Sequence, residues 1–274
     1  MKNLIWPNKN TKLFISMAIN PGNTGAILHN SLFKIYKLNN IYLPLKVKNF
    51  YQAKKLLTNL DFNGCSLSMP YKEKLIKFID KLDTNAKKIG SINTVLRKKK
   101  KLLGFNTDYY ASKEILKKEK LSKNFTVLIL GCGGVAKAVL QSVIDLNFKN
   151  IVLSSRNKNK FNKLKIKKKI TFLQWKKRNT INAEIIINTT PLGMFGKNSK
   201  SIPINISKDK LPKLIYDLPV NPNGNLLSQY AKKNNIKYIS GLNSSFLQGI
   251  KQFEIYNNMS LDLKDLKKKI IPKY

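Results

Sequence analysis

The 274-residue sequence contains few of the side chains that most often bind metals or move protons. Its only histidine is His29, and its two cysteines, Cys65 and Cys132, are far apart and belong to no CxxC or Cys/His cluster. We therefore expect no metal site, and two reduced cysteines with a structural role. Since a single histidine within a helical pattern is more often a half-buried packing residue, the acid–base chemistry must be sought elsewhere.

Acidic residues and arginine are also scarce. The chain has 14 Asp and Glu against 52 Lys and Arg, a formal net charge of +38, and all of the cations except Arg97, Arg156 and Arg178 are lysine. Specific nucleic-acid readers depend on the planar guanidinium of arginine, whereas here Lys, Asn and Ile occupy every kind of position. This bias is typical of A/T-rich codons and favours a lysine-coated surface without a specific nucleic-acid partner. A basic nucleic-acid-binding protein remains the alternative, and weak, salt-sensitive binding to polyanions is expected in both cases.

Long apolar runs are missing as well. No stretch approaches the roughly eighteen apolar residues of a membrane span, and the opening MKNLIWPNKN lacks the apolar core of a signal peptide. We expect a cytoplasmic protein with no membrane partner. With 42% hydrophobic residues, the chain is long enough for two α/β domains, each with its own buried sheet.

The middle of the chain has the pattern of a nucleotide-binding unit. An apolar strand pattern at residues 126–130 is followed by Gly131-Cys132-Gly133-Gly134, a helical stretch at 135–146 and a second apolar strand at 150–154. A strand that turns on glycines into a helix directs the free N–H groups of that helix toward the turn, where a pyrophosphate usually binds. The glycines alone would also fit an ordinary tight turn, so the neighbouring elements carry the prediction.

The end of the second strand in this unit lacks an acid. NAD-binding versions have an Asp or Glu there that binds the adenine ribose hydroxyls, but this chain reads Ser154-Ser155-Arg156-Asn157-Lys158-Asn159-Lys160. Hydroxyl groups and cations at this place suit a 2′-phosphate. The sequence therefore predicts NADP as the cofactor.

The first part of the chain alternates between strand and helix patterns and predicts a small α/β sheet. Strands are expected at 13–17, 41–45 and 65–69, and helices at 26–38 and 50–60. Pro70 is expected to open a helix that runs to about residue 79. Two further strands, 92–96 and 102–105, flank a lysine run that is expected to form a solvated hairpin tip.

The remaining patterns complete the second domain and a C-terminal tail. They predict helices at 109–119 and 226–233, a hinge at 121–124 and strands at 170–173, 183–187, 213–217 and 237–239. Helical patterns at 244–257 and 261–269 are expected to pack back on the first domain. We thus predict an α/β substrate-binding domain at 1–108, joined by 244–274, and a nucleotide-binding domain at 109–243.

Two side chains stand out as candidates for proton chemistry. Lys72 is expected in the first turn of the helix opened by Pro70, where a cation opposes the helix dipole, so the position is poor for stability and useful for acid–base work. Ser66 and Ser68 alternate on the preceding strand and are expected to project toward the same strand end. Asp108 follows Asn106 and Thr107 at the end of the hairpin, as either the N-cap of the next helix or an active-site carboxylate.

These residues belong to a longer series of motifs. The series consists of Ser-Met-Pro-Tyr-Lys-Glu at 68–73, Ile-Asn-Thr at 92–94, Asn-Thr-Asp at 106–108, Gly-Cys-Gly-Gly-Val-Ala at 131–136, Arg-Asn at 156–157, Asn-Thr-Thr-Pro-Leu-Gly-Met at 188–194, and Ser-Gly-Leu…Leu-Gln at 240–248. In order and approximate spacing, over essentially the whole chain, it resembles the shikimate dehydrogenase family. The co-occurrence of the motifs is far more specific than any one of them.

The resemblance implies an N-terminal α/β substrate domain and a C-terminal Rossmann NADP-binding domain, with the active-site cleft between them. It implies the reversible NADPH reduction of 3-dehydroshikimate to shikimate, in aromatic amino-acid and chorismate biosynthesis, and a monomer or homodimer. Lys72 and Asp108 match the catalytic pair of the family. The expected substrate-binding positions are Asn23, Ser66, Ser68, Asn93, Asn106 and Gln248. The expected cofactor-binding positions are Gly131, Gly133, Gly134, Val135, Ala136, Ser155, Arg156, Asn157, Lys160, Thr189, Gly193, Met194 and Gly241.

The chain departs from the family pattern at two places. Where family members usually have a Ser-x-Ser pair that binds the substrate carboxylate, this chain reads Asn23-Thr24-Gly25. A family tyrosine a few residues after Tyr216-Asp217 is also replaced, since Leu218-Pro219-Val220 follow. Both changes resemble the shikimate dehydrogenase-like subgroup. An oxidoreductase acting on quinate or another cyclic hydroxy acid is therefore the alternative function.

Overall fold

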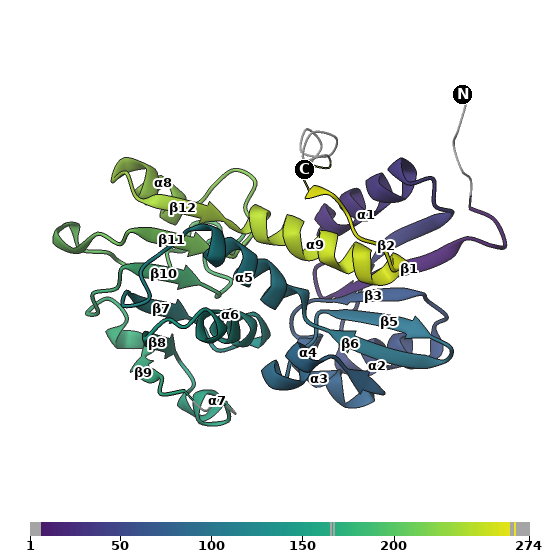
Figure 1. The fold of residues 1–274 in the computed structure, drawn as a ribbon, viewed down its shortest axis with the longest axis horizontal. Coiled ribbons are helices and arrows are strands. Elements are labelled where there is room, and N and C mark those ends of the chain that lie inside the picture. The colour runs from purple at the N-terminus through teal and green to yellow at the C-terminus, as the bar shows by residue number, and fades with distance from the viewer. Residues whose placement is uncertain (1–6, 165, 167, 264–265, 267–274) are drawn as a thin grey trace. The chain divides into compact units, whose positions relative to one another are not determined.

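The computed structural model describes residues 7–164, 166, 168–263 and 266, and the chain forms two compact units. The first unit contains the described residues up to Thr107 and those from Phe246 onward. The second unit is Asp108–Ser245. Each unit is built around its own six-stranded sheet (Figure 1), in agreement with the predicted α/β class.

The sheet of the first unit has the strand order β2-β1-β3-β5-β6-β4. Strands β2, β1 and β3 are parallel, whereas β5 runs antiparallel to both β3 and β6. Its strands are β1 (Lys12–Ala18), β2 (Asn40–Lys46), β3 (Gly64–Leu67), β4 (Lys81–Leu82), β5 (Thr94–Lys98) and β6 (Lys101–Phe105). Lys99 and Lys100 form the tight turn between β5 and β6 with φ angles of 46° and 65°, so the lysine run is the hairpin tip that the sequence predicts.

Two helices of the first unit begin where a side chain caps them. The Asn49 side chain accepts a hydrogen bond from the N–H of Gln52 at the start of α2 (Phe50–Asn59), and Asp83 accepts one from Ala86 at the start of α4 (Thr84–Ile89). Helix α1 spans Thr24–Ile35. The core between helices and sheet contains Ile15, Met17, Leu57, Phe62, Cys65 and Val95 among other buried residues.

The segment after Pro70 differs from the prediction. The expected helix to about residue 79 breaks at Leu75 into α3 (Tyr71–Lys74) and a 3₁₀ turn at Ile76–Phe78. Leu75 is fully buried in the core, and its N–H donates to the carbonyl of Tyr71 at 3.1 Å where α3 ends. The two-residue strand β4 and helix α4 were not predicted, because their sequence is too short to show a hydrophobic period.

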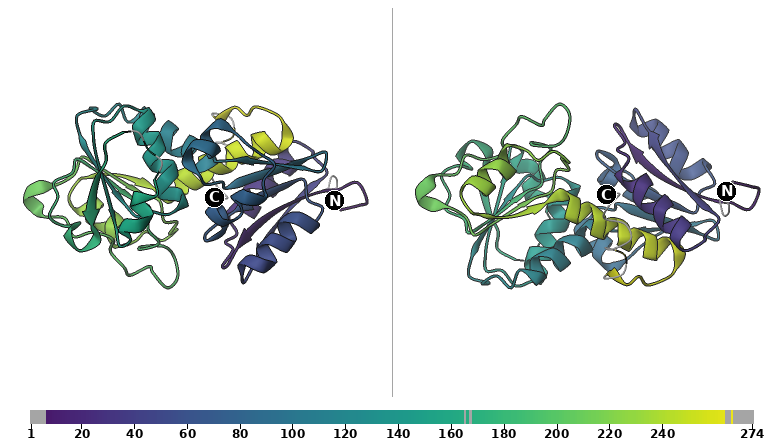
Figure 2. Two further views of the ribbon diagram at one scale, coloured as in Figure 1. Left: turned by 90° about the horizontal axis from the view of Figure 1, so that it is seen from below. Right: turned by 90° about the horizontal axis from the view of Figure 1, so that it is seen from above.

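The second unit has an all-parallel sheet with the order β12-β11-β10-β7-β8-β9. This is the doubly wound order of dinucleotide-binding domains, in which the direction of winding reverses between β7 and β10. Its strands are β7 (Thr126–Leu130), β8 (Asn150–Ser155), β9 (Thr171–Gln174), β10 (Ile185–Asn188), β11 (Leu214–Asp217) and β12 (Lys237–Ser240). In both views of Figure 2 the strands fan out across each sheet, the twist that is usual for sheets.

Five α-helices belong wholly or partly to the second unit as described. They are α5 (Thr107–Lys118), α6 (Gly134–Asp145), α7 (Lys158–Asn162), α8 (Leu226–Lys233) and α9 (Gly241–Asn257), the last of which continues into the first unit. The described part of the connection between β10 and β11 contains only one 3₁₀ turn, Lys208–Lys210. The predicted helix at 261–269 falls partly outside the described residues. Among the residues described, no helix is long and apolar enough to cross a membrane.

Candidate functional site

The glycine turn of the second unit lies at the point where the sheet changes its winding direction. Gly131 follows β7 with a φ of 112°, and its N–H donates to the carbonyl of Ser154 at 2.8 Å. The Thr189 side chain, after β10, donates to the carbonyl of Leu130 at 2.5 Å. A Cβ atom on residue 131 would lie 2.5 Å from Thr189 Oγ1, so both the backbone angle and the space require glycine here.

Helix α6 begins at this turn without a side-chain cap. Gly133 occupies the N-cap position in an extended conformation, and a Cβ atom there would meet nothing within 4 Å. The N–H groups of Gly134, Val135 and Ala136 are in the first turn, where an α-helix offers them no acceptor of its own. The turn therefore provides donors and the positive end of a helix dipole to an anion such as a pyrophosphate.

The end of β8 is basic, as the sequence predicts. Ser155 is buried, and its hydroxyl donates to the carbonyl of Asn157 at 3.2 Å. The side chain of Asn157 caps α7 by accepting from the N–H of Lys160 at 3.0 Å. Arg156 and Lys160 are exposed, and the sequence holds no carboxylate between residues 154 and 164. This strand end can receive a phosphate but has no acid to bind ribose hydroxyls.

A buried carboxylate lies at the end of β11. Asp217 is fully buried, and its Oδ1 accepts a hydrogen bond from Asn188 Nδ2 at 2.7 Å. Its Oδ2 accepts from Asn225 Nδ2 at 2.7 Å and from the hydroxyl of Tyr238 at 2.8 Å. Burial raises the pKa of Asp217, and the three donors offset part of that shift.

The two amides bound to Asp217 also hold the loop that follows β10. Asn188 donates to the carbonyl of Leu192 at 3.0 Å and accepts from the N–H of Thr190 at 3.0 Å. Asn225 donates to the carbonyl of Gly193 at 3.2 Å. Gly193 has a φ of 90°, and a Cβ atom there would lie 2.6 Å from Asn225 Nδ2. The loop that contains the predicted cofactor positions is thus held by two amides, and one carboxylate, Asp217, binds both of them.

Two other predicted cofactor positions, Met194 and Gly241, also belong to the second unit. Met194 follows Gly193 and is 38% exposed. Gly241 is the first residue of α9, and a Cβ atom on it would collide with the carbonyl oxygen of Leu218. Packing against Leu218 is enough to explain why residue 241 is a glycine. Its role in binding a cofactor stays a prediction.

Polar side chains of the first unit form a connected cluster around Asn93. Asn93 Nδ2 donates to Thr107 Oγ1 at 2.9 Å and to Gln248 Oε1 at 3.3 Å. Its Oδ1 accepts from the N–H of Thr107 at 2.8 Å and from Thr94 Oγ1 at 2.9 Å. Asn93 and Thr107 are buried, whereas Gln248 is half-buried on α9. The cluster brings together two predicted substrate positions from distant parts of the chain.

A residue that the sequence did not reveal continues this cluster. Gln252 is 3% exposed and lies one helical turn after Gln248 on α9. Its Nε2 donates to the carbonyl of Asn93 at 3.2 Å and to Thr94 Oγ1 at 3.0 Å, and its Oε1 accepts from Ser66 Oγ at 3.0 Å. Two glutamines four positions apart on an amphipathic helix were the only available signal, since such residues share a face.

The other predicted residues of the first unit lie in α3 or directly beside the ends of β3, β6 and α1. Lys72 is half-buried, and its carbonyl accepts from the N–H of Ile92 at 2.9 Å, next to Asn93. Ser68 is exposed at the end of β3. Asn106 is buried and donates to the carbonyl of Ser91 at 2.8 Å. Asn23 is exposed directly before α1 and provides no side-chain cap.

Asp108 begins the second unit, whereas Lys72 belongs to the first. Asp108 is 8% exposed in the first turn of α5, which starts at Thr107. The alternative in which Asp108 is the N-cap is therefore wrong, because the cap position precedes the helix. The helix-dipole argument for Lys72 also fails, since α3 has only four residues and aligns too few peptide dipoles.

His29 is a packing residue, although it is fully buried and not half-buried as expected. Its ring stacks on Tyr42 with centroids 4.5 Å apart and an interplanar angle of 4°. Phe33, Phe253 and Tyr256 complete the aromatic surroundings. Neither ring nitrogen makes a well-formed hydrogen bond with the described residues, which fits a neutral imidazole held by stacking.

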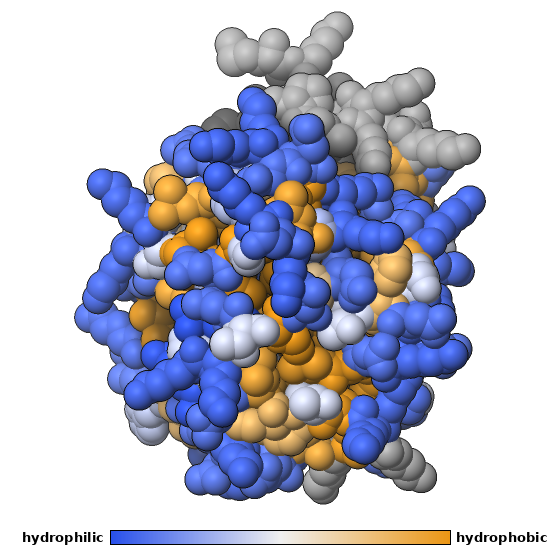
Figure 3. All heavy atoms as spheres, turned by 90° about the vertical axis from the view of Figure 1, so that its left-hand side faces the viewer, coloured by the Kyte–Doolittle hydropathy of each residue, from blue (hydrophilic) through white to orange (hydrophobic). Residues whose placement is uncertain are grey.

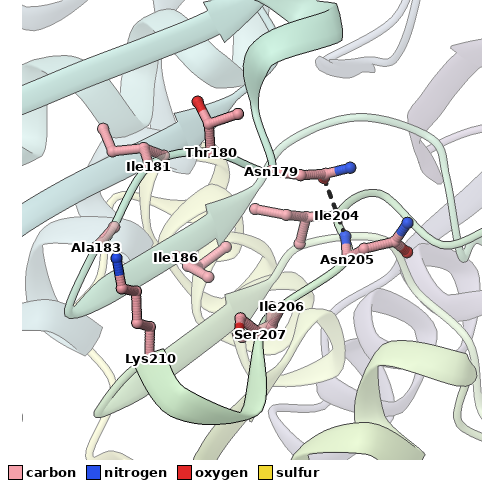
Figure 4. Close-up of a pocket in the computed structure, with 10 residues that line it drawn as sticks. All are labelled: Asn179, Thr180, Ile181, Ala183, Ile186, Ile204, Asn205, Ile206, Ser207 and Lys210. Carbon is pink, nitrogen blue, oxygen red and sulfur yellow. Dashed lines mark hydrogen bonds between the residues drawn. The ribbon is translucent and has the colours of Figure 1, made fainter.

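A separate cavity of about 180 Å³ lies in the second unit beside the start of β10 (Figure 4). Isoleucine side chains of Ile181, Ile186 and Ile204 line it, with Lys210 and the hydrogen-bonded pair Asn179 and Asn205 beside them. It contains none of the predicted site residues.

Figure 3 shows one face of the molecule, on which hydrophilic side chains project around an apolar area and are not gathered into one stripe.

The family model and the sequence relatives that match this chain all belong to one family. Residues 23–95 match the model of the shikimate dehydrogenase substrate binding domain. A relative from Clostridium perfringens, shikimate dehydrogenase (NADP(+)), is 35% identical over 240 residues, which cover 86% of this chain and 88% of the relative. The enzyme of the same name from Maridesulfovibrio salexigens is 30% identical over 273 residues, covering 97% of this chain and 98% of the relative.

Solved structures agree with this result over nearly the whole chain. A shikimate 5-dehydrogenase-like protein superimposes with a TM-score of 0.81 at 28% identity, covering 97% of this chain and 98% of that one. A shikimate dehydrogenase in complex with NADP⁺ superimposes with a TM-score of 0.82 at 27% identity, covering 98% of this chain and 97% of that one. On the identity and coverage of its relatives, the chain belongs to the shikimate dehydrogenase family.

Proposed function

We propose that this chain is an NADP-dependent oxidoreductase that interconverts 3-dehydroshikimate and shikimate in aromatic amino-acid biosynthesis. The observation that carries the proposal is the acid-free, basic end of β8 beside the glycine turn, in a chain whose relatives are named NADP(+) shikimate dehydrogenases. A substrate-binding domain of residues 1–108 with 244–274 would bind the substrate, and residues 109–243 would bind the cofactor. We further propose a cytoplasmic protein that is a monomer or a homodimer.

NADP would lie along the carboxyl edge of the second sheet. The glycine turn and the first turn of α6 would bind the pyrophosphate through backbone N–H groups, and Arg156 with Lys160 would bind the 2′-phosphate. When bound, the reduced cofactor supplies hydride. The proposed cofactor-binding residues are Gly131, Gly133, Gly134, Val135, Ala136, Ser155, Arg156, Asn157, Lys160, Thr189, Gly193, Met194 and Gly241.

Lys72 and Asp108 would handle the proton that accompanies hydride transfer. Reduction of a ketone places a proton on the oxygen while hydride reaches the carbon, so an ammonium at this oxygen can act as the acid and its amine as the base in reverse. The carboxylate of Asp108 would orient the ammonium and stabilise its charged form. Asn23, Ser68, Asn93, Asn106 and Gln248 are the proposed substrate positions, whereas Ser66, which the sequence also predicts, is engaged by Gln252, Tyr42 and Tyr256.

A second candidate function, oxidation of quinate or another cyclic hydroxy acid, is favoured by one feature of the first unit. Position 25 has no hydroxyl, and a Cβ atom there would lie 3.2 Å from the hydroxyl of Tyr42. A serine hydroxyl that would bind the substrate carboxylate is thus missing, and Tyr42 limits the space for one. The substrate acid group would lose a donor at this position.

The proposal is tested by NADPH oxidation with 3-dehydroshikimate and by the reverse reaction with shikimate or quinate, each run with NADP and NAD. We expect activity with 3-dehydroshikimate, a preference for NADP, and a loss of turnover in Lys72→Ala. Lys74→Ala, an exposed lysine on the same short helix, is the matched control. If no cyclic hydroxy acid is turned over while duplex DNA binds with a steep salt dependence, the nucleic-acid alternative replaces this proposal.

A further inference from the structure

A chain of buried hydrogen bonds in the first unit has a fixed direction. It starts at the carbonyl of Asn93, which can only accept, so the nitrogen of the Gln252 amide must face it. The same Nε2 donates to Thr94 Oγ1. The oxygen of the amide then faces the opposite way, toward Ser66 Oγ at 3.0 Å. Because an amide oxygen is an acceptor, Ser66 has to donate its proton to Gln252.

The remaining contacts of Ser66 use the rest of its hydrogen-bonding capacity. A hydroxyl has one proton and two acceptor positions. Its proton goes to Gln252, and its oxygen accepts from the hydroxyl of Tyr42 at 2.9 Å and lies 3.1 Å from the hydroxyl of Tyr256. Since Ser66 has no second proton, Tyr256 is the donor of that contact. Three protein groups therefore occupy the whole hydroxyl.

Packing keeps this arrangement in place. Gln252, Tyr42 and Tyr256 are 3%, 2% and 7% exposed, so none of them can turn to solvent. The ring of Tyr42 is held by its stacking on His29. Tyr256 packs over residue 64, where a Cβ atom would lie 2.5 Å from its ring. The Ser66 contacts are also no longer than 3.1 Å, whereas the contacts of Gln248 Oε1 with Asn93 and Thr107 are 3.3 Å.

We propose that Gln252 is a specificity-determining residue of the proposed active site, because it takes the only proton of Ser66 and so removes Ser66 from the donors available to a substrate. Ser66 is then a positioning residue and not a substrate ligand. Together with the missing hydroxyl at position 25, this leaves a substrate acid group without a hydroxyl donor from either Ser66 or residue 25. The favoured substrate is a cyclic hydroxy acid bound by its ring hydroxyls. The proposal rests on the proposed function.

The test measures dissociation constants of shikimate and quinate by titration calorimetry on the NADP-bound protein. Ser66→Ala should leave both constants within about twofold of wild type, whereas a ligand hydroxyl bound to a carboxylate would cost about tenfold. In a Gln252→Leu background, where the acceptor is gone, the Ser66 proton becomes available, and adding Ser66→Ala should then weaken binding by about fivefold or more. Gln252→Glu keeps an acceptor and is the matched control, in which Ser66→Ala should again have little effect.

Thermal melting and the dissociation constant of NADP show whether each variant is folded. If Gln252→Leu does not fold, Ser66→Ala in the wild-type and Gln252→Glu proteins still decides the matter. A loss of tenfold or more in Ser66→Ala, with melting and NADP binding unchanged, would overturn the proposal, as would equal effects of Ser66→Ala in the Leu and Glu backgrounds. Wild-type protein that binds neither acid would instead refute the proposed function, so the two failures are distinguishable.

Discussion

Acidification should destabilise the first unit through His29. The imidazole is fully buried and stacked flat on Tyr42, with Phe33, Phe253 and Tyr256 around it. Burial lowers its pKa from 6.5 to about 4, and the Gln252 side chain offsets part of this shift. Protonation in the folded state would place an imidazolium in an aromatic core, where it loses its hydration. Unfolding exposes the ring to water and lets it take up the proton.

The size of the effect follows from the two pKa values. Because the folded pKa is the lower one, the unfolded state binds more protons between about pH 6.5 and pH 4, and the free energy of unfolding falls as the pH drops through this window. At about 1.4 kcal/mol per pKa unit, the loss amounts to about 3 kcal/mol at pH 4. Domains have only about 5–15 kcal/mol of stability in total, so this loss is easily measured.

The measurement compares wild type with His29→Phe, which keeps a flat ring against Tyr42 but does not titrate. Urea unfolding is followed between pH 7 and pH 4, with amide hydrogen exchange in β1 and α1 to report on the first unit separately. Carboxylates titrate equally in both proteins, so their effect cancels in the difference. We expect wild type to lose about 3 kcal/mol more than the variant. Parallel pH curves for the two proteins would refute the assignment of a neutral, buried His29.

Three further outcomes concern the cofactor and the reaction. Arg156→Ala should weaken NADP binding by about tenfold to a hundredfold and leave NAD binding nearly unchanged, since a charge-assisted bond to phosphate contributes about 1.5–3 kcal/mol; equal losses would exclude contact with the 2′-phosphate. Lys72→Ala and Asp108→Asn should each lower turnover by about 10²–10⁴ and leave NADP affinity unchanged. The double mutant should keep far more turnover than the product of the two single losses would leave, because the two residues act together. Near-wild-type turnover in Lys72→Ala would rule out its role. Gly25→Ser combined with Tyr42→Phe should raise kcat/KM for shikimate by about tenfold, while Gly25→Ser alone gains less because its Cβ lies 3.2 Å from the Tyr42 hydroxyl; a loss in the double variant would show that this loop serves another acid.

The strands and longer helices were predictable because each one carries a local signal. The strand at 126–130 and the helix at 226–233 match β7 and α8 to the residue, since an apolar run or a helical period is bounded there by turn residues. The short elements were missed for the opposite reason. In β4 only two residues pair with β6, and α7 has five residues, too few to show a period.

The glycine turn and the basic end of β8 were likewise found from local sequence, whereas the buried partners were not. Gln252 contacts a serine 186 positions away in the chain, and no local pattern encodes that pairing. Asp217 was noted as part of a motif, but its three donors come from the two neighbouring strands, β10 and β12, and from the N-cap of α8. Such contacts appear only when the topology brings strand ends together.

The composition explains why amides recur in these buried networks. With 14 acids against 52 cations, this chain has few carboxylates to pair with buried cations, and each additional charge adds to the repulsion within a protein of net charge +38. An Asn or Gln side chain provides donors and an acceptor without charge. Asn93 and Gln252 perform this task in the first unit, and Asn188 and Asn225 do so around Asp217 in the second. Because an amide has a donor end and an acceptor end, each such residue also fixes the direction of the bonds beyond it, as Gln252 does for Ser66. The neutral networks that this composition favours thus decide which polar groups are left for a ligand.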